Sequence, residues 1–118
     1  TMFGRRRYIP EVFSSNWQVR REGERMAVNM PIQGAATGDI IKMEMVAVDQ
    51  WIHEKQCVSD VILLLQVHDE LIFEIKDTTL DNMVPTIKQL MENVATLNVP
   101  LIVDVKIGKN WKEQEAWG

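Results

Sequence analysis

VILLLQVHDELIFEI, residues 61–75, contains two apolar runs separated by a short polar gap. Both runs are short and rich in branched side chains, which is typical of buried β-strands. Only His68, Asp69 and Glu70 lie between them, so the connection has room for nothing but a tight hairpin turn. We therefore predict two paired strands, Val61–Val67 and Leu71–Ile75, with carboxylates at their tip. A rigid acidic turn can bind a divalent metal ion, although acidic turn residues are more often simply solvated.

The residues before this hairpin predict two helices. Good helix-capping residues occupy positions 14–16, so a first helix is expected from Trp17 to about Asn29. Pro31 cannot comfortably continue that helix, but it suits the first position of the next one. Apolar residues recur at helical spacing over roughly residues 36–55, which predicts the second helix.

The residues after the hairpin predict one more helix and one more strand. Thr78 or Thr79 is expected to cap a helix that continues to about Val94, with Pro85 causing a kink or a delayed start. A final strand is expected over residues 101–107. The order helix, helix, strand, strand, helix, strand predicts an α+β fold, in which helices cover one face of a small antiparallel sheet.

Composition places the chain among ordinary globular proteins. Its 118 residues fit one domain, with 46% hydrophobic and 25% charged residues. No apolar run is long enough to span a bilayer, and no signal peptide opens the chain. Cys57 is the only cysteine, which excludes an intrachain disulfide and favours a reducing, cytoplasmic location. The chain starts at Thr1, which suggests either a piece of a longer protein or a residue left by a tag.

The charge is distributed unevenly along the chain. The net charge of −4 argues against a free-standing nucleic-acid binder. All six arginines, however, lie within residues 1–25, where only three glutamates oppose them and the net charge is +3. Clustered arginines suit bidentate contacts with phosphate. A solvated basic face is the equally plausible alternative.

Arg25, Asn29 and Gln33 follow one another at intervals of four residues. Arg25 and Asn29 are therefore expected to share a helix face, and Gln33 to open the next helix near that face. Such side chains can bind the minor-groove acceptors of a duplex, which are similar for every correct base pair. An ordinary polar helix face would show the same spacing.

Five segments, taken in order, resemble one known family. They are FGRRRYIP (residues 3–10), ERMAVNMPIQG (24–34), QVHDEL (66–71), NVPL (98–101) and GKNW (108–111). Together they are similar to the C-terminal part of the palm of family A DNA polymerases, the bacterial DNA polymerase I type. The resemblance covers nearly the whole chain.

The resemblance implies roles for individual residues. Asp69 matches the palm aspartate that binds the catalytic magnesium ions, and Glu70 matches the adjacent acid, which supports the site less directly. His68 matches a histidine near the primer terminus. Three further residues match those that contact the minor groove of the primer–template: Arg25, Asn29 and Gln33. The Arg5–Arg7 run resembles a segment close to the DNA backbone.

The resemblance also implies an activity for the parent protein. A DNA-directed DNA polymerase of replication and repair adds deoxynucleoside triphosphates to a primer 3′-hydroxyl with two Mg²⁺ ions. Residues 1–118 would form the C-terminal part of its palm, without the fingers and the first palm strands. Because the family's second metal-binding aspartate has no counterpart here, the isolated chain is expected to be inactive. Its uncovered apolar surface is expected to promote self-association.

One departure from the family and one alternative function are also apparent in the sequence. Residues 35–38 are one residue longer than the family pattern, and an insertion inside a helix rotates the next residues by about 100° unless Gly38 absorbs it locally. The alternative is a non-catalytic nucleic-acid-binding module, which would need aromatic residues on the sheet face. Phe73 is the only aromatic residue of the hairpin strands, and it is expected to point into the core. A purely structural role for the hairpin acids is a third possibility.

Overall fold

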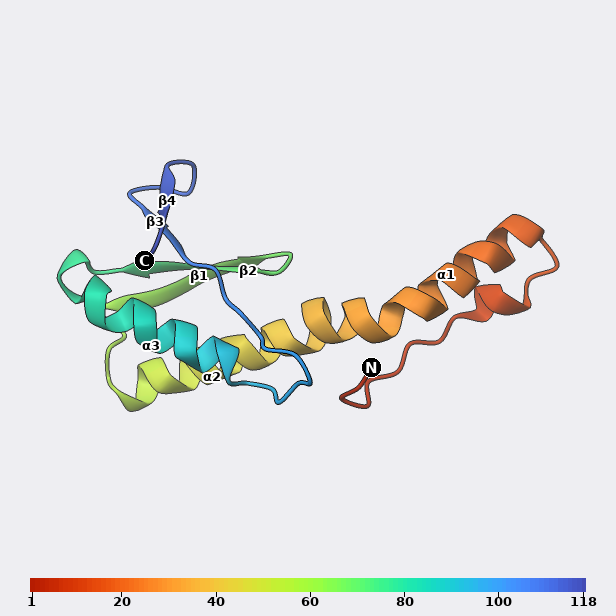
Figure 1. Cartoon of the computed structure of the whole chain (residues 1–118), viewed down its shortest axis with the longest axis horizontal. Coiled ribbons are helices and arrows are strands. Elements are labelled where there is room, and N and C mark those ends of the chain that lie inside the picture. Colours follow the sequence, from red (N-terminus) through yellow and green to blue (C-terminus); the bar gives the residue numbers. More distant parts are fainter.

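The computed structural model describes residues 1–118 as a long helical rod with a small α+β unit at one end (Figure 1). Its principal extents are 61 × 30 × 25 Å. The radius of gyration is 18.1 Å, whereas a compact domain of this length would have about 13 Å. Only 12 of the 118 residues are buried, so the core occupies one end of an elongated molecule.

The elements follow one another in a simple order. The helical elements before the hairpin are the 3₁₀-helix η1 (Pro10–Phe13), α1 (Trp17–Gln33), the π-helix η2 (Gly34–Ile40) and α2 (Ile41–Glu54). The remaining elements are β1 (Val61–Val67), β2 (Glu70–Ile75), the 3₁₀-helix η3 (Asp77–Thr79), α3 (Leu80–Glu92), β3 (Lys106–Gly108) and β4 (Gln114–Ala116). The α+β class predicted from the sequence is confirmed.

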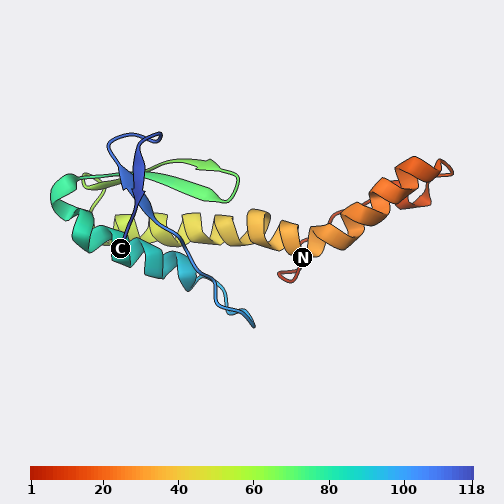
Figure 2. The same ribbon diagram turned by 45° about the horizontal axis from the view of Figure 1, so that its top comes forward.

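The rod is helical from α1 through η2 to α2 without interruption. The side chain of Asn16 caps α1 by accepting a hydrogen bond from the backbone of Gln18 at 3.0 Å, as the capping pattern predicted. The expectation that Pro31 opens a second helix is wrong, because Pro31 lies inside α1. A proline in a helix removes one backbone hydrogen bond and crowds the preceding turn. Figure 2 shows the rod bent where α1 joins the next segment.

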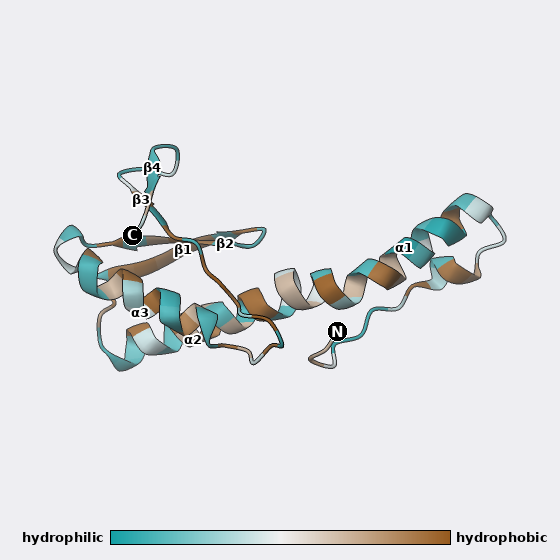
Figure 3. Cartoon of the chain, in the orientation of Figure 1, coloured by the Kyte–Doolittle hydropathy of each residue, from teal (hydrophilic) through white to brown (hydrophobic).

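The β1–β2 hairpin is formed as predicted, with Val67 paired to Glu70 across a two-residue turn. The register shifts between Leu63 and Leu65, which leaves Leu64 as the extra residue of a β-bulge. Figure 3 shows mainly hydrophobic residues along the strands. The hairpin is therefore a short, twisted layer that can pack on helices with one face.

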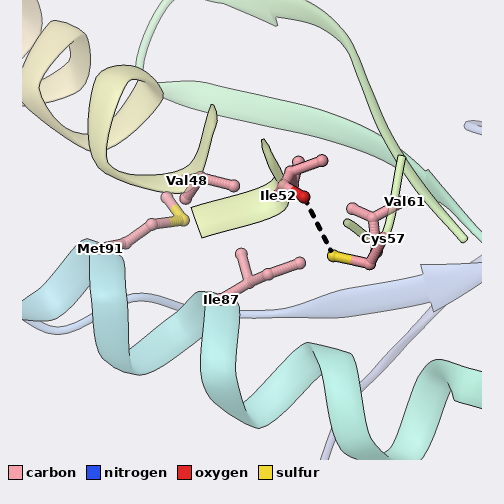
Figure 4. Packing of buried hydrophobic residues seen from close by; sticks show 6 residues of the cluster. All are labelled: Val48, Ile52, Cys57, Val61, Ile87 and Met91. Carbon is pink, nitrogen blue, oxygen red and sulfur yellow. Dashed lines mark hydrogen bonds between the residues drawn. The ribbon is translucent and has the colours of Figure 1, made fainter. Parts of the chain in front are cut away.

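The core lies where this layer meets α2 and α3 (Figure 4). Six buried side chains form it: Val48, Ile52, Cys57, Val61, Ile87 and Met91. Phe73 packs against this cluster, which confirms the expected inward orientation. The helices thus fix the hairpin at its base and leave its tip free to project.

The C-terminal third differs from the prediction in two respects. The expected strand 101–107 is wrong, because only Lys106–Gly108 is a strand, and it pairs with β4 in a separate two-stranded sheet. Val103 instead packs against the core from an irregular segment. Pro85 lies inside α3 and does not delay the start of that helix. Among the helices, none combines the length and the apolar character needed to cross a membrane.

Candidate functional site

The hairpin turn presents two carboxylates to solvent. His68 adopts a left-handed backbone conformation with φ 53°, which histidine tolerates better than most residues. The side-chain amide of Gln66 donates a hydrogen bond to the His68 carbonyl at 3.0 Å and braces the turn. Asp69 and Glu70 are exposed, and neither side chain forms a hydrogen bond or an ion pair within the chain. Their oxygens are therefore available to an external ligand.

Mg²⁺ prefers a small number of carboxylate oxygens and usually keeps water or phosphate as its other ligands. Asp69 and Glu70 supply this donor type from a rigid turn, so the residues present fit the ion. No group of three potential ligands among His, Cys, Asp and Glu comes together anywhere in the chain. The hairpin by itself could therefore supply only part of a coordination shell.

The second group of candidate residues lies along α1. Arg25, Asn29 and Gln33 are all exposed, and none of their side chains has a hydrogen-bond partner within the chain. Arg25 and Asn29 lie on one continuous helix, as predicted. The expectation for Gln33 is corrected, because it is the last residue of α1 and does not open the next helix. Each step of four advances slightly more than one turn, so the three form a slowly winding row.

The structure keeps these two groups on different parts of the molecule. The hairpin rises from the core and its tip projects over the rod, toward the side on which α1 lies (Figures 1 and 2). The contacts of α1 are mainly with η1 and η2. A ligand that touches both Asp69 and Arg25 must therefore be large and extended.

The arginines near the N-terminus are not equivalent. Arg5 forms an ion pair with Asp39, with its Nε 2.6 Å from Oδ1, and its Nη2 donates to the Gly34 carbonyl at 2.8 Å. Arg7 makes only a weak contact with the sulfur of Met26 at 3.4 Å, and Arg6 makes no side-chain hydrogen bond. Arg6 and Arg7 border an open groove of about 330 Å³ beside α1. Two arginines thus remain free for an anionic partner.

Sequence reasoning missed Asp39. Hydrogen bonding from the Thr1 hydroxyl and the nearby Arg5 guanidinium hold the pKa of Asp39 below its usual value, although partial burial opposes them. Asp39 lies in the π-helix η2, and the one-residue insertion expected beside it at residues 35–38 stays a prediction.

Glu44 is a further residue that sequence reasoning missed. It lies on the buried face of α2, one turn before Val48, and is only 5% exposed. Burial raises its pKa to about 7. Its position in an apolar stripe was the available signal. Glu44 bears on stability and lies outside the two groups described above.

The family model for DNA polymerase family A matches residues 1–113. Among similar proteins are DNA polymerase I of Pseudomonas aeruginosa, 46% identical over 113 residues, and DNA polymerase I of Mycobacterium tuberculosis, 48% identical over 111. These alignments cover 96% and 94% of this chain. The chain spans only 12% of the length of each relative.

One solved structure is similar in fold as well as in sequence. It is the polymerase domain of Pol1 from M. smegmatis, in complex with a DNA primer–template and dNTP. The TM-score is 0.76 and the sequence identity 47%, over 86% of this chain and 17% of that one. Most of this chain thus has a counterpart in the fold of that polymerase domain.

Proposed function

The chain belongs to DNA polymerase family A, and we propose that it forms the C-terminal part of the palm of a DNA-directed DNA polymerase. The observation that carries this proposal is the position of Asp69. Its carboxylate is exposed, without a partner in the chain, at the tip of a hairpin whose base is fixed by the core. The similarity to a polymerase domain bound to primer–template and dNTP supports the same function.

In this function Asp69 would ligate Mg²⁺, and Glu70 would add negative charge beside it. Two such ions, when bound in a complete polymerase, activate the primer 3′-hydroxyl and stabilise the leaving group. The contribution of this chain is to fix the backbone that carries the carboxylate, because a two-residue turn leaves the main chain at Asp69 little freedom. His68 would lie near the primer terminus.

The row on α1 would bind the primer–template. Arg25, Asn29 and Gln33 can donate hydrogen bonds to purine N3 and pyrimidine O2, which lie in similar places for every correct base pair. Their exposure and their lack of partners within the chain support this role. Contacts of this kind test the geometry of a base pair without testing its sequence.

The isolated chain should not extend a primer. One hairpin carboxylate pair cannot complete two metal sites, and the chain brings no third potential ligand to it. The alternative of a non-catalytic stacking module is disfavoured, because Phe73 packs into the core and is not presented for bases.

A segment exchange tests the proposal. The matching segment of the P. aeruginosa DNA polymerase I would be replaced by this chain, and primer extension measured with and without Mg²⁺. We expect template-directed extension that Asp69→Ala reduces by at least about a hundredfold. Asp77→Ala is the matched control, since Asp77 is an exposed acid at the start of η3, just after β2 and away from the turn. Equal activity of the Asp69→Ala exchange, or extension by the isolated chain, would refute the proposal.

A further inference from the structure

The π-helix η2 is the only irregular part of the rod between α1 and α2. A π-helical turn holds one residue more than an α-helical turn, and its backbone hydrogen bonds are displaced. At its start, two carbonyl groups receive side-chain donors. The Thr37 hydroxyl donates to the Gln33 carbonyl at 2.7 Å, and Arg5 donates to the Gly34 carbonyl at 2.8 Å. Side chains thus replace part of the helical hydrogen bonding.

One guanidinium group links both ends of η2. While its Nη2 binds the Gly34 carbonyl, the Nε of Arg5 binds one carboxylate oxygen of Asp39 at 2.6 Å. The other oxygen of Asp39 accepts a hydrogen bond from the Thr1 hydroxyl at 2.5 Å. Charge-assisted hydrogen bonds of this kind are stronger than neutral ones. We call the contacts among Thr1, Arg5, Gly34 and Asp39 the π-helix clamp.

The sequence of η2 makes room for this clamp. A Cβ atom at Gly38 would overlap the guanidinium of Arg5. A Cβ atom at Gly34 would lie 3.0 Å from the methyl carbon of Met30 and 3.2 Å from the Thr1 side chain. The absence of both side chains lets the N-terminal segment lie directly against the helix. The guanidinium of Arg5 therefore packs directly against the backbone of η2 at Gly38.

The clamp lies at the junction of two parts of the molecule. On one side, α1 packs mainly on η1 and η2 and carries Arg25 and Asn29. On the other side, α2 packs on η2 and α3, and its buried face contributes to the core that holds the hairpin. The orientation of α1 relative to Asp69 is consequently set through η2.

We infer that Arg5 is a positioning residue and not a phosphate ligand. With Asp39 it locks the π-helix, and so it holds the DNA-binding row of α1 in register with the hairpin carboxylates. This inference rests on the proposed binding of duplex DNA by α1. It assigns phosphate contact, among the clustered arginines, to the free Arg6 and Arg7.

A distance measurement tests the positioning role directly. Nitroxide labels would be attached to the 118-residue chain at Glu22→Cys on α1 and Glu74→Cys on β2, with Cys57→Ser to remove the native thiol. We expect Arg5→Ala and Asp39→Asn each to broaden the distribution of label distances. The double variant should be no broader than either single one, since both break the same contact. Arg6→Ala, the matched control, should leave the distribution unchanged.

A binding measurement separates positioning from phosphate contact. The affinity for a fluorescein-labelled primer–template duplex would be measured by anisotropy at several salt concentrations. We expect Arg5→Ala to lower the affinity about tenfold with the salt slope unchanged. Arg6→Ala should reduce the slope of the logarithm of affinity against the logarithm of salt concentration by about one, which corresponds to one released counterion fewer. Arg5→Lys, which keeps the charge but not the two-point contact, should resemble Arg5→Ala and guards against a folding defect in the alanine variant.

The outcomes distinguish this inference from the proposed function. A reduced salt slope for Arg5→Ala, with unchanged label distances, would overturn the positioning role. An unchanged affinity for Arg5→Ala, when Arg25→Ala weakens binding, would also overturn it while leaving DNA binding by α1 intact. If Arg25→Ala has no effect on binding, the proposed role of α1 fails, and the label distances still decide whether the clamp holds η2.

Discussion

Gly23 of α1 lies so close to η1 that a Cβ atom there would be 2.9 Å from the backbone nitrogen of Val12 and 2.9 Å from the Cβ of Glu11. Gly23 is also the only buried residue of α1. The 3₁₀-helix therefore docks on α1 at the one position of that helix that lacks a side chain. This contact makes η1 and α1 a single arm.

Gly23→Ala should loosen the arm. Alanine favours a helix over glycine by about 1 kcal/mol, but here its methyl group must displace the backbone of η1. We expect faster proteolysis between residues 10 and 16, with the helical content of the chain retained. Glu22→Ala, at the adjacent exposed position, is the control. Unchanged proteolysis of Gly23→Ala would mean that η1 is not held by this contact.

Arg25→Ala should weaken binding to a primer–template duplex about tenfold, since a charged donor to the groove or backbone contributes roughly 1–3 kcal/mol. The loss should be similar for duplexes of different sequence, because minor-groove acceptors hardly distinguish them. Fluorescence anisotropy measures this. Lys55→Ala, which removes an equal charge just after α2, should bind as the unaltered chain does. Equal losses for the two variants would indicate a nonspecific charge effect.

Glu44 should make stability depend on pH. Its pKa is raised from 4.5 to about 7 by burial, so the folded chain favours the neutral form. The contribution of neutral Glu44 to the stability of the folded chain is fully present below pH 4.5, and it is lost as the pH rises through about 7. At pH 8 we expect the free energy of unfolding of Glu44→Gln to exceed that of the unaltered chain by roughly 1–3 kcal/mol. Denaturant titration measures this difference. The two should be similar at pH 4.5, and a difference that does not change with pH would contradict this assignment.

The isolated chain should self-associate through the outer face of the hairpin. Ile62, Leu64 and Leu65 are 46%, 51% and 40% exposed at nearby positions of β1. Exposed apolar side chains gathered on one strand favour association in water. Light scattering after size exclusion should show a molar mass that increases with protein concentration. Leu64→Lys should make this increase smaller. Val58→Lys is the control, because Val58 is an exposed apolar residue outside the strands. If the unaltered chain is a monomer at all concentrations, the predicted association does not occur.

The hairpin and the exposure of its acids were predictable because they depend on residues that are neighbours in the chain. Val61–Val67 and Glu70–Ile75 are short apolar runs around a gap that only a tight turn can close. The cap at Asn16 and the shared helix for Arg25 and Asn29 are local in the same sense. The family resemblance, which rests on ordered short segments, was also accessible from the sequence.

Other features depend on partners that are distant in the chain, and they emerged only in the folded molecule. Pro31 remains within α1, although local propensity favours a break there. Val103 packs against the core from the irregular segment 101–105, which does not pair with the hairpin although its composition favours a strand. Arg5 forms an ion pair with Asp39, which lies 34 positions away in the chain. This ion pair distinguishes Arg5 from Arg6 and Arg7, which have no such partner. Spacing along a chain reports neighbours within a few residues, whereas these outcomes depend on which distant surfaces meet.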